Sequence, residues 1–158
     1  MTWKTLPVPL LLCLSAAACV GDSPRTASEA ADAGPAAEAA ASGEPVPTVT
    51  ILEPAEGSEA TGPSVAVRLT AAGVEIVPAG EPVPGTGHHH LYLDADLTEG
   101  DQPVPSVPGR IIHLGTGASE YTFENVTPGA HRLIAVVADG LHVPLQPWVV
   151  DTVTFTVR

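Results

Sequence analysis

Cysteine, basic side chains and aromatic rings are all scarce in this chain of 158 residues. Both cysteines, Cys13 and Cys19, lie near the N-terminus, so the remainder has no thiol for a disulfide, a nucleophile or a soft metal ligand. Six basic residues against 18 acidic ones give a formal charge of -12, which disfavours binding to nucleic acid. Only 4% of residues are aromatic, while 17 prolines and 15 glycines indicate a β-rich domain with many turns.

The N-terminus has the pattern of a secretory signal. Lys4 precedes an apolar run from Leu6 to Ala18, which is too short to cross a membrane as a helix. Small residues lead into Cys19, as in the cleavage site of bacterial lipoproteins, although Ala16 stands where that pattern usually has leucine. The sequence predicts removal of residues 1–18 as a signal peptide and a lipid on Cys19. Cleavage by an ordinary signal peptidase after Ala18 is the alternative.

Residues 20–47 consist almost entirely of Ala, Glu, Gly, Ser and Pro. Such a segment buries too little apolar surface to offset the entropy lost on ordering. Residues 19–47 are therefore predicted to form a flexible tether that holds a domain of residues 48–158 off a membrane. The predicted location is the cell envelope, at the periplasmic or outer-membrane face, with the lipid as the membrane contact. The sequence identifies no protein partner.

Short alternating apolar runs, separated by Pro and Gly, fill the chain from Thr48 onward. The clearest half-buried strand has Val65, Val67 and Leu69 on one face. Residues 131–138 are apolar on both faces, as in a central strand that is covered twice. About 8 such strands without a segment of helical period predict an all-β fold, an immunoglobulin-like antiparallel β-sandwich of about 7–8 strands. A small open barrel is the alternative.

Half of the six histidines lie in one predicted strand, between Gly85 and Asp94. Strand alternation puts four side chains on one face: His88, His90, Tyr92 and Asp94. Three point to the opposite face, which the leucines mark as the core side: His89, Leu91 and Leu93. The two-residue spacing of His88 and His90 lets two imidazoles reach one ion from a rigid base.

Two further histidines fall at predicted strand ends, where the loops of a sandwich converge. His113 precedes a Gly-Thr-Gly turn, and His142 follows the turn at Asp139 and Gly140. Both are therefore candidates for the third and fourth ligands. Imidazoles suit divalent zinc, copper or nickel, and the lack of nearby Cys or Met disfavours Cu(I).

The residues alone leave three uses of these histidines open: metal ligation, a hydrogen-bonded structural cluster, and anion binding or pH sensing. A structural role is favoured for His89 and His131. No nucleophile, general acid or general base can be singled out, so the protein is expected not to be an enzyme.

Five short runs, in this order, resemble a bacterial family called domain of unknown function 4399: Pro78 to Gly80, Gly85 to Leu91, Ile112 to Glu120, Pro128 to Leu133, and Asp139 to Pro144. The likeness covers about residues 63–157. It implies a small secreted or lipid-anchored β domain without an assigned activity. It also groups all six histidines with Asp139 as one set.

The sequence therefore predicts a lipid-anchored, non-enzymatic domain of the cell envelope whose histidines bind a divalent transition metal, zinc or Cu(II). The predicted ligands are His88, His90, His113 and His142. The predicted supporting residues are His89, Glu120, His131 and Asp139. Of these, Asp139 or Glu120 would orient an imidazole. The alternative is a structural or interaction module of the envelope whose histidines only brace loops.

Overall fold

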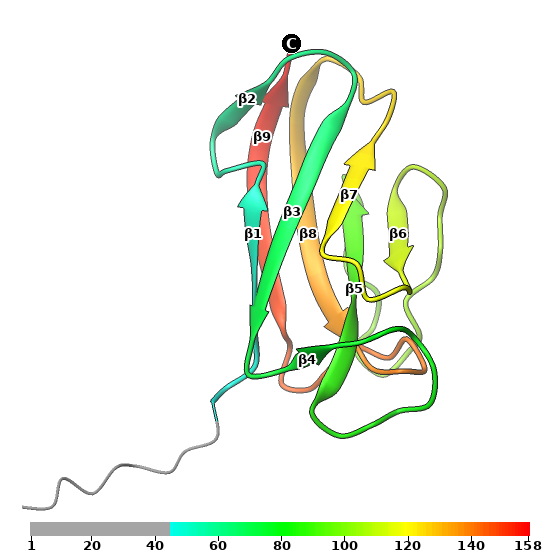
Figure 1. Cartoon of the computed structure of the whole chain (residues 1–158). Coiled ribbons are helices and arrows are strands. Elements are labelled where there is room, and N and C mark those ends of the chain that lie inside the picture. The colour runs from blue at the N-terminus through cyan, green and yellow to red at the C-terminus, as the bar shows by residue number, and fades with distance from the viewer. Residues whose placement is uncertain (1–44) are drawn as a thin grey trace, which may run out of the picture. The chain divides into compact units, whose positions relative to one another are not determined.

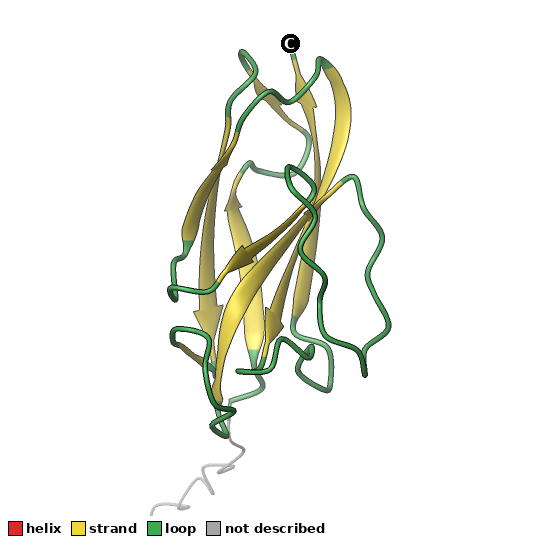
Figure 2. Cartoon of the chain, turned by 90° about the vertical axis from the view of Figure 1, so that its right-hand side faces the viewer, coloured by secondary structure: helices red, strands yellow, loops and turns green. Residues whose placement is uncertain are grey.

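The computed structural model describes residues 45–158 (Figure 1). The predicted signal peptide, the predicted lipid site at Cys19 and most of the predicted tether lie outside the described residues. Nine strands follow in chain order: β1 (Thr48–Glu53), β2 (Ser58–Ala60), β3 (Val65–Ala72), β4 (Glu75–Ile76), β5 (Thr86–Leu93), β6 (Ile111–Leu114), β7 (Glu120–Phe123), β8 (Gly129–Ala138) and β9 (Val150–Val157). Loops join them, and Figure 2 shows no helix in residues 45–158. This range accordingly contains no helix long and apolar enough to cross a membrane.

The strands form two sheets that pack face to face, which confirms the predicted all-β sandwich (Figure 1). One sheet has the order β1-β3-β7, and the other has the order β2-β9-β8-β5-β4 with β6 also paired to β5. Two short pairings, of β2 with β9 and of β4 with β5, are parallel, whereas the longer pairings are antiparallel. Strand β2 was not among the predicted strands.

One face of each sheet contributes to a shared apolar core. Strand β3 buries Val65, Val67 and Leu69, as the alternation predicts. On the facing sheet, Asp151 occupies an inward position of β9, and its Oδ2 accepts a hydrogen bond of 2.8 Å from the N–H of Ile51 in β1. This bond joins the two sheets and provides a partner for a polar group at the margin of the core.

The outer face of the larger sheet is also covered, by the long loop between β5 and β6. Val104 of this loop packs with Tyr92 of β5, with Ile111, and with Ile134 and Val136 of β8. The prediction that β8 is covered twice is therefore confirmed. Because β5 lies beside β8, every residue from Gly87 to Leu93 is buried as well.

Asp94 departs from the predicted alternation. Its φ of 49° ends the strand, and its Oδ1 accepts the N–H of Arg132 near the start of β8. A left-handed residue interrupts the two-residue period on which the prediction rested. The carboxylate consequently lies toward the opposite end of β5 from His88.

Candidate metal centre

Four imidazoles converge at the end of the larger sheet where β5 begins and β8 ends. The centroids of every pair of rings among them lie between 4.5 and 5.7 Å apart. The four are the predicted ligands His88, His90, His113 and His142. The structure thus brings together side chains from one strand interior, a neighbouring strand and a loop.

Strand register accounts for this convergence. His113 of β6 pairs directly with His90 across the antiparallel ladder. On the other edge of β5, His88 pairs with Ala138, the last residue of β8. The chain then reverses direction at Asp139, which places His142 on the face of the larger sheet that carries the other rings.

Asp139 holds the loop that presents His142. Its Oδ1 accepts hydrogen bonds from the N–H groups of Leu141, at 2.9 Å, and Val143, at 3.0 Å, on either side of the histidine. His142 itself has a φ of 70°, and its carbonyl oxygen accepts the N–H of Val104 at 2.9 Å. A non-glycine residue persists in this left-handed conformation only when its surroundings impose it. These contacts therefore fix the backbone from which the ring of His142 projects.

His113 rests on a glycine in the turn that follows it. A Cβ added to Gly115 would lie 2.2 Å from Cε1 and 2.5 Å from Nε2 of His113. The carbonyl of Gly115 in turn accepts the N–H of Ala79 at 2.9 Å, from the loop between β4 and β5. The absence of a side chain at residue 115 is what allows the ring to lie in the cluster.

The cluster is closed on one side and open on the other. His88 and His90 are completely buried, whereas His142 is partly buried and His113 is exposed. Burial, followed by the proximity of His113 and His142, lowers the pKa of His88 from 6.5 to about 4. Burial and the neighbouring rings likewise lower the pKa of His90 to about 3. These two imidazoles are therefore neutral near pH ~7, which is the state that binds a metal ion.

The ring nitrogens are spaced for a single ion. One ligand atom from each of His88, His113 and His142 lies within 4.8 Å of the others. Two nitrogens bound to one tetrahedral zinc at about 2.0–2.1 Å are roughly 3.3 Å apart, so modest rotations of the side chains would close the distance. His90 lies beside this trio, with its Nε2 2.9 Å from Nε2 of His88.

Two buried ring atoms in this group lack a hydrogen-bond partner within the described part of the chain, Nδ1 of His88 and Nδ1 of His90. Leaving a buried polar atom unpaired costs about 1–3 kcal/mol. A metal ion would give such an atom a partner. The residues present therefore fit a divalent ion that prefers imidazole, such as Zn²⁺ or Cu²⁺.

His131 lies at the other end of β8 and does not join the four rings. Its Nδ1 is 2.7 Å from Oδ2 of Asp94 and its Nε2 is 2.8 Å from the carbonyl oxygen of Thr127. Burial lowers the pKa of His131, but these two acceptors outweigh that effect and raise the pKa overall. The ring donates to both acceptors only as the charged imidazolium, which makes this a structural ion pair.

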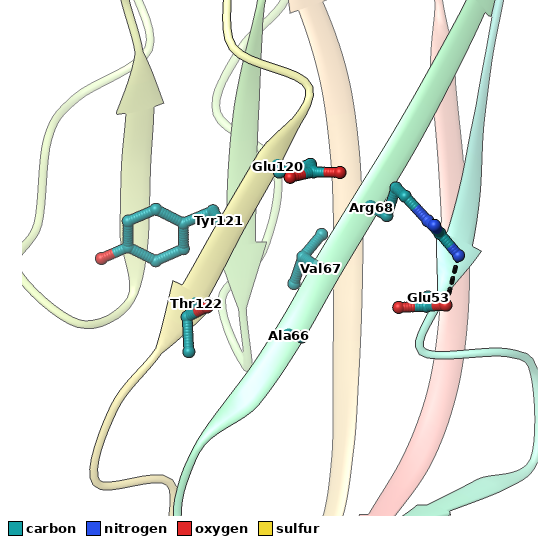
Figure 3. A pocket seen from close by; sticks show the side chains of 7 residues that line it. All are labelled: Glu53, Ala66, Val67, Arg68, Glu120, Tyr121 and Thr122. Carbon is teal, nitrogen blue, oxygen red and sulfur yellow. Dashed lines mark hydrogen bonds and ion pairs between the residues drawn. The ribbon is translucent and has the colours of Figure 1, made fainter.

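Glu120 and His89 also lie apart from the cluster. Glu120 opens β7 of the smaller sheet, beside Arg68, which forms an ion pair with Glu53 (Figure 3). His89 points into the space between the sheets, and burial lowers its pKa to about 4. Of the four predicted supporting residues, Asp139 alone has contacts that position one of the clustered rings.

The sequence profile of the family described as Domain of unknown function (DUF4399) matches residues 67–158. The chain belongs to this family. The matched range contains all four clustered histidines and the turns that position them. No curated protein matches this DUF4399 chain.

Two solved structures have a limited likeness to the chain. One is an engineered protein from the Northeast Structural Genomics Consortium, with 12% identity and a TM-score of 0.41 over 73% of this chain. The other is the endo-β-1,4-mannanase of Thermotoga petrophila, with 15% identity and a TM-score of 0.43 over 74%. This chain spans 21% of the length of each.

Sequence reasoning missed two features that shape the DUF4399 cluster. The contact between Gly115 and the ring of His113 had a partial signal in the Gly-Thr-Gly motif, which predicts a turn but not the packing of a ring on it. The hydrogen bond from Val104 to His142 joins a loop to a distant turn through backbone atoms. Backbone contacts of this kind leave no mark in the residue types.

Proposed function

We propose that this DUF4399 protein is a lipid-anchored, non-enzymatic component of the cell envelope that binds one divalent transition metal ion, Zn²⁺ or Cu²⁺. The observation that carries the proposal is the convergence of four imidazoles on ring centroids no more than 5.7 Å apart. Three of them offer ligand atoms within 4.8 Å of one another.

The chemistry of the group supports a transition metal over a hard cation. Calcium and magnesium prefer oxygen ligands, whereas imidazole suits zinc and Cu(II). Oδ1 of Asp139, the predicted acidic neighbour, accepts two backbone N–H groups and thereby orients the loop. The group therefore resembles a binding site more than a set that includes a general acid or base.

The proposed location depends on the N-terminal sequence. An apolar run that ends in small residues and Cys19 supports export and lipid attachment. The acidic composition, with a formal charge of -12, supports attraction of cations to such an anchored domain.

A structural role for the histidines is the second candidate. The bond of 2.9 Å between Nε2 of His90 and Nε2 of His88 is the observation that favours it, because hydrogen-bonded imidazoles brace a fold without any ion. In that case the domain would serve as an interaction or spacer module of the envelope.

Metal content distinguishes the two candidates. We would produce the whole chain without a histidine tag, dialyse it against Zn²⁺ or Cu²⁺ and then against buffer, and measure bound metal by plasma mass spectrometry. The test variant is the double substitution His113→Asn and His142→Asn, which alters the two less buried rings, and the control is Glu120→Gln. Metal binding predicts one ion per chain in the natural protein and the control, and loss of that ion in a double variant with an unchanged circular dichroism spectrum. Equal metal content in all three proteins would reject the metal site and leave the structural role.

A further inference from the structure

We propose that three of the four imidazoles hold the ion, that His90 orients one of them, and that the remaining coordination position opens to solvent and takes a small anion. The ligands in this assignment are His88, His113 and His142. The inference rests on the proposed function and adds to it the class of molecule that the bound metal recognises.

The hydrogen bond between the two strand histidines joins the proposed ligand to its support. It occupies Nε2 of both His88 and His90 and leaves Nδ1 of both rings buried without a partner, so the membership of the trio, and not this bond, separates the two roles. A metal-bound imidazole usually donates its other N–H to an acceptor, and that bond fixes the tautomer and the orientation of the ring. His90 provides such an acceptor in Nε2. It also lies outside the trio whose ligand atoms are mutually within 4.8 Å.

The opening follows from the gradient of burial across the trio. His88 has no exposed surface, His142 is partly buried and His113 is exposed. An ion among these three rings is enclosed by β5 on one side and meets water on the other. Sites with three protein ligands and an accessible fourth position are those in which that position holds an exchangeable ligand.

Charge determines what that ligand is. Three neutral imidazoles leave the two positive charges of the ion uncompensated, and a bound cation is the largest local charge in its site. The carboxylate of Asp139 is close enough to act on His88 electrostatically, but its Oδ1 accepts the N–H groups of Leu141 and Val143, which ties that oxygen to the loop. A small monovalent anion from solution, bound at the open position, supplies one of the negative charges that the three imidazoles lack.

Azide titration of the copper-loaded whole chain tests this assignment. Azide bound to Cu(II) gives a charge-transfer absorption band that neither component has alone. The expected result is a band that saturates at one azide per bound ion, with electron paramagnetic resonance showing three coordinating imidazole nitrogens. The double variant His113→Asn and His142→Asn serves as the blank for copper held elsewhere, including at the N-terminal cysteines.

His90→Gln separates the supporting role from ligation. As a supporting residue it should lower metal affinity by roughly 10–100-fold while the ion, at saturating copper, keeps its azide band. Four imidazole nitrogens with no azide band, or complete loss of the ion in His90→Gln, would overturn the inference and leave metal binding standing. A natural chain that holds no more copper than the blank would overturn both this inference and the proposed function.

Discussion

Replacing Gly115 with alanine should remove His113 from the proposed metal centre without unfolding the domain. The added Cβ would lie 2.2 Å from Cε1 of the His113 ring. Ordinary contacts between carbon atoms are about 3.5–4.0 Å, so the ring must move by more than about 1 Å. The backbone at residue 115 is outside the left-handed region, and His113 is exposed, so the ring can swing into solvent.

The expected change in metal affinity is large and the expected change in stability is small. Metal sites require ligand distances within about 0.2 Å of their ideal values, which a displacement of this size exceeds. Structural zinc sites provide about 10–16 kcal/mol over four ligands, so one lost ligand is worth roughly 3–4 kcal/mol, or about 100–1,000-fold in Kd. Alanine in place of a glycine with a permissive backbone changes the free energy of unfolding by only about 1 kcal/mol.

Isothermal titration with Zn²⁺ and Cu²⁺, together with urea unfolding, measures both quantities. Gly80→Ala is the matched control, because a Cβ there meets nothing within 4 Å and its φ is also outside the left-handed region. The control should bind metal as the natural protein does. If Gly115→Ala also binds with unchanged affinity while the domain stays folded, His113 is not a ligand and the reasoning fails.

Three further predictions follow from contacts around and away from the cluster. Asp139→Ala should lower the free energy of unfolding by about 1–3 kcal/mol and weaken metal binding, because two N–H groups beside His142 lose their acceptor. Asp139→Asn keeps an acceptor oxygen, so it should retain most of the stability in urea unfolding and most of the metal affinity in titration. His131→Gln should destabilise the domain by a similar amount through its bond to Asp94 but leave metal affinity unchanged, and a fall in affinity would contradict the placement of His131 outside the centre. Burial and neighbouring rings lower the pKa of His90 from 6.5 to about 3, so the stability that its neutral ring contributes is complete above pH ~6.5 and is lost as the pH falls toward ~3. The free energy of unfolding of the metal-free natural protein should therefore depend more steeply on pH below ~6.5 than that of His90→Gln. Parallel curves for the two proteins would contradict this prediction.

The strands could be predicted from sequence because their period is local. Alternating apolar residues identified the buried face of β3, and an unbroken apolar run identified β8 as covered on both sides. The convergence of the histidines was partly predictable for the same reason. Strand alternation paired His88 with His90, and turn residues put His113 and His142 at strand ends.

Features that depend on contacts between distant segments escaped this reasoning. Strand β2 is only three residues long and forms its parallel pairing with β9, nearly a hundred residues along the chain. The cover over Tyr92, Ile134 and Val136 on the outer face of the larger sheet comes from a loop in which Val104 lies among prolines and polar residues. Glu120 was predicted to support the four clustered imidazoles, but it lies in β7, which belongs to the smaller sheet.

X-ray absorption spectroscopy of the zinc-loaded whole chain tests the central claim most directly, because it reports the atoms bound to the ion. The account predicts nitrogen neighbours at about 2.0–2.1 Å with the outer-shell scattering of imidazole, and loss of that signal in the double variant His113→Asn and His142→Asn. A shell of oxygen without imidazole scattering, or of sulfur at about 2.3 Å from the N-terminal cysteines, would show that the histidine cluster is not the metal site.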